Sequence, residues 1–131
     1  IGHYEAALEK SPNNIVALNN AAWALRDKDS AKALGYAERA VRIAPNAVEI
    51  LDTYGWILHG RKEYAKAVEV LRKAATANAA PGVHYHLAAA LSEAGEKNEA
   101  KRILDEVLGK DAAFDERQAA EELRKRLAAS R

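Results

Sequence analysis

The chain has 131 residues, 49% of them hydrophobic and 30% charged, and its 20 basic and 19 acidic side chains leave a formal net charge of +1. Because the two signs are interleaved and no basic tract stands out, neither nucleic acid nor an anionic membrane is predicted as a partner. The chain contains no cysteine, which excludes disulfides and thiolate metal sites. Its apolar runs fall far short of the ~20 residues that cross a bilayer, so no membrane insertion is predicted for this segment.

The opening segment, residues 1–12, is predicted to be the second helix of an incomplete repeat. Tyr4, Ala7 and Leu8 have helical spacing and come just before Pro12, and the same arrangement recurs before Pro45. The first helix of this opening repeat is missing. We therefore expect a fragment of a longer array, whose N-terminal edge normally packs on an earlier repeat and offers a surface for self-association.

The segment 13–45 is predicted to form a pair of helices. The first runs to about Asp27 and the second to about Ile43, each with apolar residues at helical spacing. The turn between them looks one residue shorter than in the repeats that follow. Candidate N-caps, whose side chains accept first-turn amide hydrogens, are Asn13 or Asn14 for the first helix and Asp29 or Ser30 for the second.

Two further helix pairs are predicted at residues 46–79 and 80–112. Pro45 ends one helix and suits the first turn of the next, because proline cannot continue a helix but fits its start. The linker 78–82 is the loosest, with asparagine or alanine where the earlier repeats place proline. Gly95, between the two helices of the third pair, suits a left-handed turn position.

The pattern changes after Gly109, and residues 113–131 are predicted to hold a capping helix that ends near Ala129. Its acidic residues lie nearer the start and its basic residues nearer the end, which complements the helix dipole. An atypical, highly charged last helix is what an array needs to shield its terminal apolar face. The apolar positions of this helix are Ala119, Ala120, Leu123 and Leu127.

These segments repeat one pattern at a fixed period. Trp23 and Trp56 are 33 residues apart, and the same interval separates Pro12 from Pro45. The leucines that share this spacing are Leu25, Leu58 and Leu91. A fixed period of this length is the signature of a solenoid, in which similar helix pairs stack on their neighbours.

Small and apolar residues recur at matching places in each period. They are Leu51, Tyr54, Gly55 and Leu58 followed by Ala67, Leu71 and Ala74 in the central repeat, the small residues Ala22, Ala33, Ala88 and Ala100 in the others, and Pro12 and Pro45 at the repeat ends. Together these positions resemble the tetratricopeptide repeat (TPR) family over nearly the whole chain. The resemblance implies an all-α fold, a right-handed superhelical α-solenoid of antiparallel helix pairs with a C-terminal capping helix.

Two shorter strings carry a finer resemblance. Residues 52–58 and 84–88 are similar to TPR proteins of bacterial cell-envelope and exopolysaccharide systems, above all to the C-terminal repeats of PEP-CTERM-type TPR lipoproteins. This likeness implies an envelope-associated or periplasmic protein. Composition alone leaves the cytoplasm equally open.

No catalytic or metal-binding constellation emerges from the sequence, and we expect neither enzyme activity nor a cofactor. His84 and His86 are two residues apart, so a helix would direct them differently, and no carboxylate completes a ligand set at i+4. The histidines are therefore interpreted as scattered surface or groove residues. The glycines occur singly, so a phosphate-binding loop is not predicted either.

In the TPR family the first helix of each pair lines a concave groove, and the resemblance implies a partner-binding surface there. Trp23 and Trp56 are expected to stand above one another in adjacent repeats, and large aromatic side chains supply much of the energy at interfaces. Alternatively both rings pack inside the protein beside Ala22 and Gly55. The two arrangements are compatible, since one ring can pack on one face and show the other. The candidate partner-binding residues are Asn19, Trp23, Arg26, Glu49, Asp52, Trp56, His59 and Tyr85.

The predicted function is therefore a non-catalytic scaffold that binds a protein or peptide segment in the groove. The cationic clamp with which some TPR domains hold chaperone C termini is absent, because Trp23, Glu49 and Asp52 occupy the corresponding surface. The alternative function is a structural spacer or self-association module of a longer TPR array.

Overall fold

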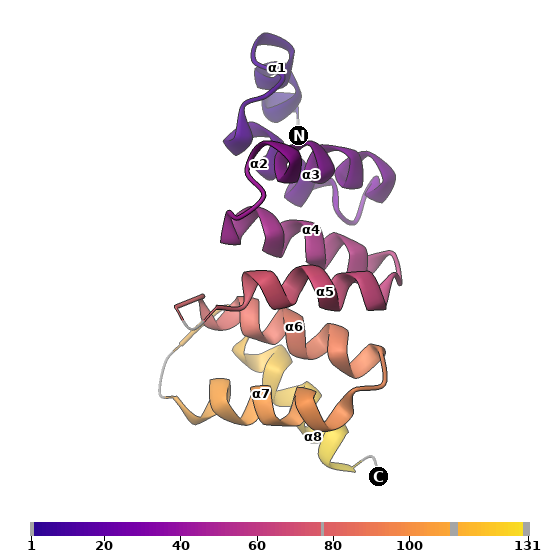
Figure 1. The fold of residues 1–131 in the computed structure, drawn as a ribbon, viewed down its shortest axis with the longest axis vertical. Coiled ribbons are helices and arrows are strands. Elements are labelled where there is room, and N and C mark those ends of the chain that lie inside the picture. Colours follow the sequence, from indigo (N-terminus) through magenta and orange to yellow (C-terminus); the bar gives the residue numbers. More distant parts are fainter. Residues whose placement is uncertain (1, 77, 111–112, 130–131) are drawn as a thin grey trace.

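The computed structural model of the chain describes residues 2–76, 78–110 and 113–129, and these form helices joined by short turns without a strand. The helices are α1 (Gly2–Lys10), α2 (Ile15–Leu25), α3 (Ser30–Ile43), α4 (Val48–Gly60), α5 (Tyr64–Ala74), α6 (Pro81–Glu93), α7 (Lys97–Gly109) and α8 (Arg117–Ala129). Figure 1 shows them stacked along the long axis of the molecule, from α1 at one end to α8 at the other. The predicted all-α solenoid is confirmed.

The helices form two rows. Each helix packs on the next in sequence, and α2, α4, α6 and α8 also pack on one another in that order. The backbones of α3, α5 and α7 lie farther apart, and Arg72 of α5 reaches Glu99 of α7 only through its side chain, with Nη2 2.8 Å from Oε1. The row with the closer spacing is the inner, concave one. It therefore contains the first helix of each predicted pair.

Small residues let the two rows approach closely. Ala22, Gly55 and Ala88 of the inner row are fully buried, and so are the alanines of the outer row at the matching positions. A Cβ placed on Gly55 would lie 2.5 Å from Cγ of Leu71, so only glycine fits there without a shift of the neighbouring leucine. Around these contacts the large, fully buried side chains are Leu18, Leu58, Leu71, Leu91 and Leu104.

The first helix pair is capped by side chains at both starts. Oδ1 of Asn14 accepts the amide hydrogen of Ala17 at 3.1 Å, and Oδ1 of Asp29 accepts that of Lys32 at 3.2 Å. Of the predicted alternatives, the structure therefore selects Asn14 and Asp29. Both short polar side chains satisfy an amide that the helix itself leaves unpaired.

Counted from the packing leucine to the N-cap of the following helix, the first turn is one residue shorter than the next two, as the sequence predicts. The amide of Asp29 bonds to the carbonyl of Leu25, four residues back, at 2.8 Å. At the other two turns the amides of Glu63 and Glu96 bond five residues back, at 3.0 and 2.8 Å. That longer closure needs a residue with positive φ, which is Gly95 (93°) in one turn and, unforeseen, Lys62 (66°) in the other.

The two ends of the stack are covered differently. At the C-terminal end, α8 buries Ala120, Leu123 and Leu127 against α7 and α6, which confirms the predicted cap. It begins at Arg117, slightly later than expected. At the N-terminal end Leu8 is only 7% exposed and packs on α2, so it is not part of an open edge. The side chain of Tyr4 lies outside the described residues. None of the described helices has the length and apolar character to cross a membrane.

Candidate functional site

Two cavities on the inner row contain most of the predicted partner-binding residues. The larger, of about 410 Å³, lies between α2, α4 and α6 and is lined by Asn19, Trp23, Glu49 and Asp52. A smaller one, of about 160 Å³, lies at the C-terminal ends of α2 and α4 and is lined by the remaining candidates of those helices, Arg26, Trp56 and His59. The last candidate, Tyr85 on α6, lines neither cavity, but its ring centroid lies 6.0 Å from that of Trp56.

His86 lines the larger cavity and stacks on Trp56, which lines the smaller one, and it is not among the site residues predicted from the sequence. Its side chain is almost wholly buried, so of the two places predicted for the histidines His86 lies in the groove and not on the open surface. Nδ1 of His86 lies 2.7 Å from Oδ1 of Asp52, so the ring N–H of α6 donates to a carboxylate of α4. The signal was present in the spacing, because His86 continues the column of Asn20 and Thr53 at the same period.

Trp56 is held between two imidazole rings. The centroid of His59 lies 4.3 Å from that of Trp56 with the planes 6° apart, and the centroid of His86 lies 4.1 Å away at 25°. The indole is half-buried and also packs on the main hydrophobic core. The two arrangements predicted for Trp56 are thus combined, since the ring packs inside the repeat stack and still reaches a cavity wall.

Trp23 is more loosely held than Trp56. Its ring carries the guanidinium of Arg26, whose Cζ lies 3.9 Å from the ring centroid, and Nη1 of Arg26 donates to the carbonyl of Trp23 at 2.7 Å. Its centroid lies 6.3 Å from His86, so His86 is the ring that both tryptophans approach. The side chain of Trp23 therefore lines the larger cavity and is not stacked between two aromatic rings as Trp56 is.

Burial shifts the ionisation of two of these groups. The pKa of His59 is lowered from its ordinary value of 6.5, first because burial disfavours the charged imidazolium and further by nearby His86, while Glu93 opposes the shift. Burial likewise raises the pKa of the Tyr85 hydroxyl. Around neutral pH both side chains are therefore uncharged rings, suited to packing and stacking.

The lowered pKa of His59 predicts a pH-dependent stability. Between its folded pKa and 6.5, the unfolded chain binds a proton that the folded chain does not, so stability is full above pH 6.5 and falls as the pH drops below it. In His59→Phe the ring stack on Trp56 remains but cannot titrate, so urea unfolding at a series of pH values should show a flatter decline than in the unchanged protein. Parallel declines in the two proteins would mean that another group causes the loss.

The buried polar side chains of the described residues are paired within the protein. Among the described residues, no group of three or more His, Asp or Glu side chains is arranged to hold a metal ion, and every buried side-chain nitrogen or oxygen has a hydrogen-bond partner. Thr53, for example, donates its hydroxyl to the carbonyl of Glu49 at 3.0 Å. The buried polar side chains around the cavities of the inner row are thus hydrogen-bonded within the protein.

Comparison with known proteins identifies the fold and the family of the chain. A crystal structure of MamA superimposes with a TM-score of 0.75 at 18% identity, covering 96% of this chain and 79% of that chain. One chain of a CopN-Scc3 complex gives 0.66 at 19% identity, covering 98% and 75%. These likenesses show a shared fold.

Curated protein sequences give no significant match. The sequence pattern of the family described as "Tetratricopeptide repeat" matches residues 58–127, which is more than half of the chain. The chain therefore belongs to the tetratricopeptide repeat family.

Proposed function

We propose that this chain is a non-catalytic scaffold that binds a peptide or protein segment in the concave groove formed by α2, α4 and α6. Members of its family act as protein–protein interaction scaffolds, and the similar CopN-Scc3 structure is that of a complex. The observation that carries the proposal is the 410 Å³ cavity on the inner row, with Trp23 in its wall. Concave sites of this size with an aromatic residue are the usual places for a ligand group.

The test starts from a displayed library of random peptides, selected on the purified chain. Peptides bound in the groove should lose about tenfold or more in affinity against Trp23→Ala, because a tryptophan in a binding cavity typically acts as a hot spot. The control is Arg42→Ala, which alters an exposed side chain of α3 on the outer row and should leave affinity unchanged. Circular dichroism verifies that both variants keep their helices.

The result that would overturn the proposal is a set of selected peptides that bind Trp23→Ala and the unchanged chain equally well. Loss of affinity in Arg42→Ala alone would move the binding surface to the outer row. Either outcome is read directly from the dissociation constants of the same peptides against the three proteins.

Self-association is a second candidate function, and two exposed aliphatic residues favour it. Val16 is 69% exposed and Ile43 41% exposed, both in the first complete repeat. If they form a contact between copies, light scattering should show a mass that rises with concentration and returns to the monomer value in a Val16→Ser/Ile43→Ser variant. A constant monomer mass at high concentration would contradict this role.

A narrower setting follows from the strings 52–58 and 84–88, which resemble bacterial envelope and exopolysaccharide TPR proteins. Both strings contribute to the cluster just described, through Asp52, Trp56 and His86. We propose on this basis that the protein takes part in envelope or exopolysaccharide assembly. Fractionation of cells that express it tests this role, and recovery in the cytoplasm alone would contradict it.

A further inference from the structure

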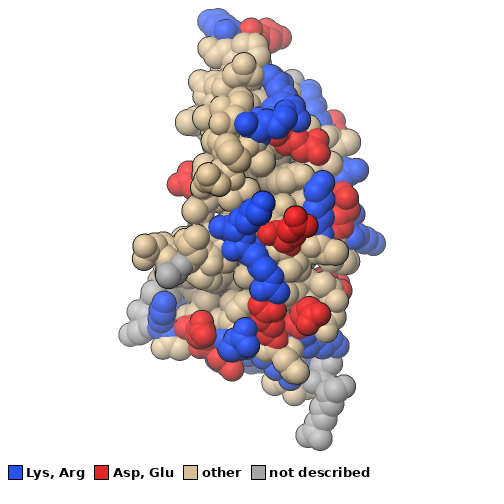
Figure 2. All heavy atoms as spheres, viewed as in Figure 1, with Lys and Arg blue, Asp and Glu red and all other residues tan. Residues whose placement is uncertain are grey.

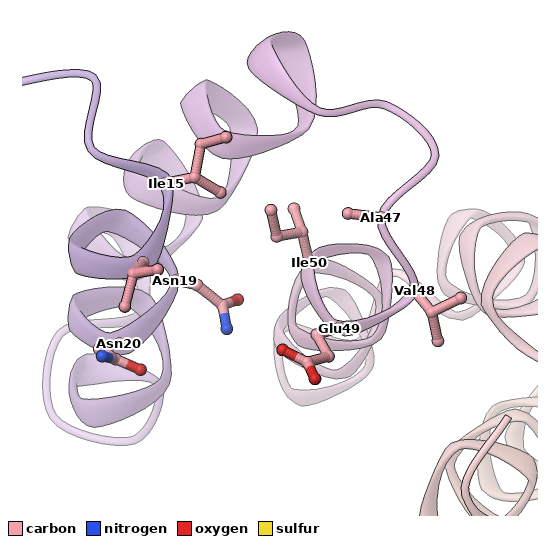
Figure 3. A pocket seen from close by; sticks show the side chains of 8 residues that line it. Ile15, Asn19, Asn20, Ala47, Val48, Glu49 and Ile50 are labelled. Carbon is pink, nitrogen blue, oxygen red and sulfur yellow. The ribbon is translucent and has the colours of Figure 1, made fainter.

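Two neighbouring cavities on the inner row differ in chemistry. The first, of about 370 Å³, lies between the starts of α2 and α4, and its aliphatic lining residues are Ile15, Val16, Ala47, Val48 and Ile50. Figure 3 shows Ile15 and Ile50 on either side of the gap between the two helices, with Asn19 and Glu49 facing each other farther along it. The first cavity is therefore an apolar cleft that becomes polar at one end.

The second cavity is the 410 Å³ one, and it continues from that polar end. Asn19, Asn20 and Glu49 line both cavities. Beyond them the second cavity adds the indole of Trp23 and two more carboxylates, Asp52 and Glu116, but no lysine or arginine. A ligand that passes from one cavity to the other would meet aliphatic side chains first and carboxylates next.

Glu116 comes from outside the repeats. It belongs to the turn before α8, and its carboxylate lies so close to the first turn of α6 that a Cβ on Gly82 would be 2.6 Å from Oε1. The positive end of the α6 dipole favours a negative charge at this place. The capping segment thus supplies the third carboxylate of the second cavity.

The negative charge of this region is local. Within α2, α4 and α6 the charged residues other than histidine are Glu49, Asp52 and Glu93, all acidic. The outer helices α3, α5 and α7 carry both signs, with the acidic residues Glu38, Glu69, Glu99, Asp105 and Glu106 beside the basic residues Lys32, Arg39, Arg42, Lys66, Arg72, Lys73, Lys97, Lys101 and Arg102. Figure 2 shows Lys and Arg interspersed with Asp and Glu on one face of the molecule. In a chain of net charge +1 the lining of the second cavity is therefore acidic, although Arg26, just past the end of α2, lies over the ring of Trp23.

We propose, as a consequence of the groove-binding function above, that the partner is a basic peptide segment of another protein. An arginine or lysine of that segment enters the second cavity, against Trp23 and between the carboxylates, and an adjoining aliphatic side chain enters the first. A cation is attracted both to carboxylates and to an indole face, and Arg26 already shows a guanidinium at 3.9 Å from the centroid of Trp23. Asn19 and Asn20, which line both cavities, can hydrogen-bond the peptide backbone between the two side chains.

The test measures binding of labelled short peptides by fluorescence anisotropy. Three peptides of equal length serve as probes. One contains leucine and arginine, the second leucine and glutamate, and the third serine and arginine. We expect the leucine–arginine probe to bind about tenfold tighter than either of the others, and its affinity to fall as salt is raised. The glutamate probe tests the charge preference, and the serine probe tests the aliphatic subsite.

Charge-neutral variants locate the effect. Glu49→Gln combined with Glu116→Gln should weaken the leucine–arginine probe at least about fivefold and reduce its salt dependence. The matched control is Glu106→Gln, an exposed carboxylate of α7 on the outer row, which should change nothing. Asp52 is left intact, because its bond to the buried His86 ties α4 to α6.

Three other results would contradict the basic-partner proposal. If the leucine–glutamate probe binds best and Trp23→Ala weakens it, the basic-partner proposal is wrong but the groove still binds peptides. If every probe binds, and neither Trp23→Ala nor the double variant changes the affinity, the groove function is overturned as well. A mass that rises with concentration, and falls in the double variant, would mean that the groove holds a second copy of this chain instead.

Discussion

Replacing Leu71 with alanine is expected to lower the free energy of unfolding by about 2–5 kcal/mol. Leu71 is fully buried on α5 within the main hydrophobic core and sits directly over Gly55 of α4. Its truncation removes transfer energy and leaves a cavity that the surrounding helices fill only partly. Because a repeat contacts only its neighbours, few other contacts compensate for this loss.

Urea unfolding followed by circular dichroism measures the change. The control is Ile43→Ala, whose side chain is 41% exposed at the end of α3 and which should shift stability by no more than about 0.5 kcal/mol. A loss below about 1 kcal/mol in Leu71→Ala would contradict the close packing of α4 on α5. A smaller denaturant slope instead would show that the array unfolds in parts, since the slope follows the surface exposed.

The helices and their packing positions could be predicted because every repeat buries the same kinds of residue at the same positions. Leu58 and Leu91, one period apart, are both almost fully buried, and so are Ala67 and Ala100. A residue type that recurs at one place on each hairpin is thereby identified as a packing residue. Side-chain size alone then indicates where the helices approach most closely, as at Gly55.

The interior of the site could not be predicted in the same way. A period identifies columns of residues, but it does not show how deep each side chain lies. His86 shares a column with Asn20 and Thr53, yet its burial depends on Asp52 in the preceding repeat, whose carboxylate satisfies the ring N–H. Glu116 lies outside the repeat pattern altogether, so only the folded chain brings it to the cavity.

Backbone conformation at the turns shows the same limit. Gly95 is recognisable as a residue in the left-handed conformation because glycine adopts positive φ at little energetic cost. Lys62 occupies the equivalent place one repeat earlier with φ of 66°, and nothing in a lysine indicates that conformation. The turn closure demands it, through the bond from the amide of Glu63 to the carbonyl of Leu58.

Replacing Gly55 with alanine is expected to destabilise the protein by about 1–3 kcal/mol, although alanine is the better helix former. The higher helix propensity of alanine would contribute up to about 1 kcal/mol of stability. Against this, the new methyl group would lie 2.5 Å from Cγ and 2.6 Å from Cδ2 of Leu71. Cγ is the branch point of a fully buried side chain, so it cannot swing away without moving α5, and the steric cost outweighs the gain.

The matched control is Gly35→Ala in the middle of α3, where an added Cβ meets no atom within 4 Å. There only the helix propensity acts, so urea unfolding should show a gain of about 0.5–1 kcal/mol. The opposite signs at Gly55 and Gly35 separate close packing from backbone entropy. A gain at both positions would mean that α4 and α5 are not in contact at Gly55.

Combining Gly55→Ala with Leu71→Ala makes the steric argument quantitative. If the new methyl group fills part of the space left by the leucine, the double variant should be less destabilised than the sum of the two single changes, by about 0.5–3 kcal/mol. Additive losses would instead place the two residues apart. Because Gly55 lies on the inner row and Leu71 on the outer, this coupling energy measures how firmly the groove-forming helix α4 is held in the stack.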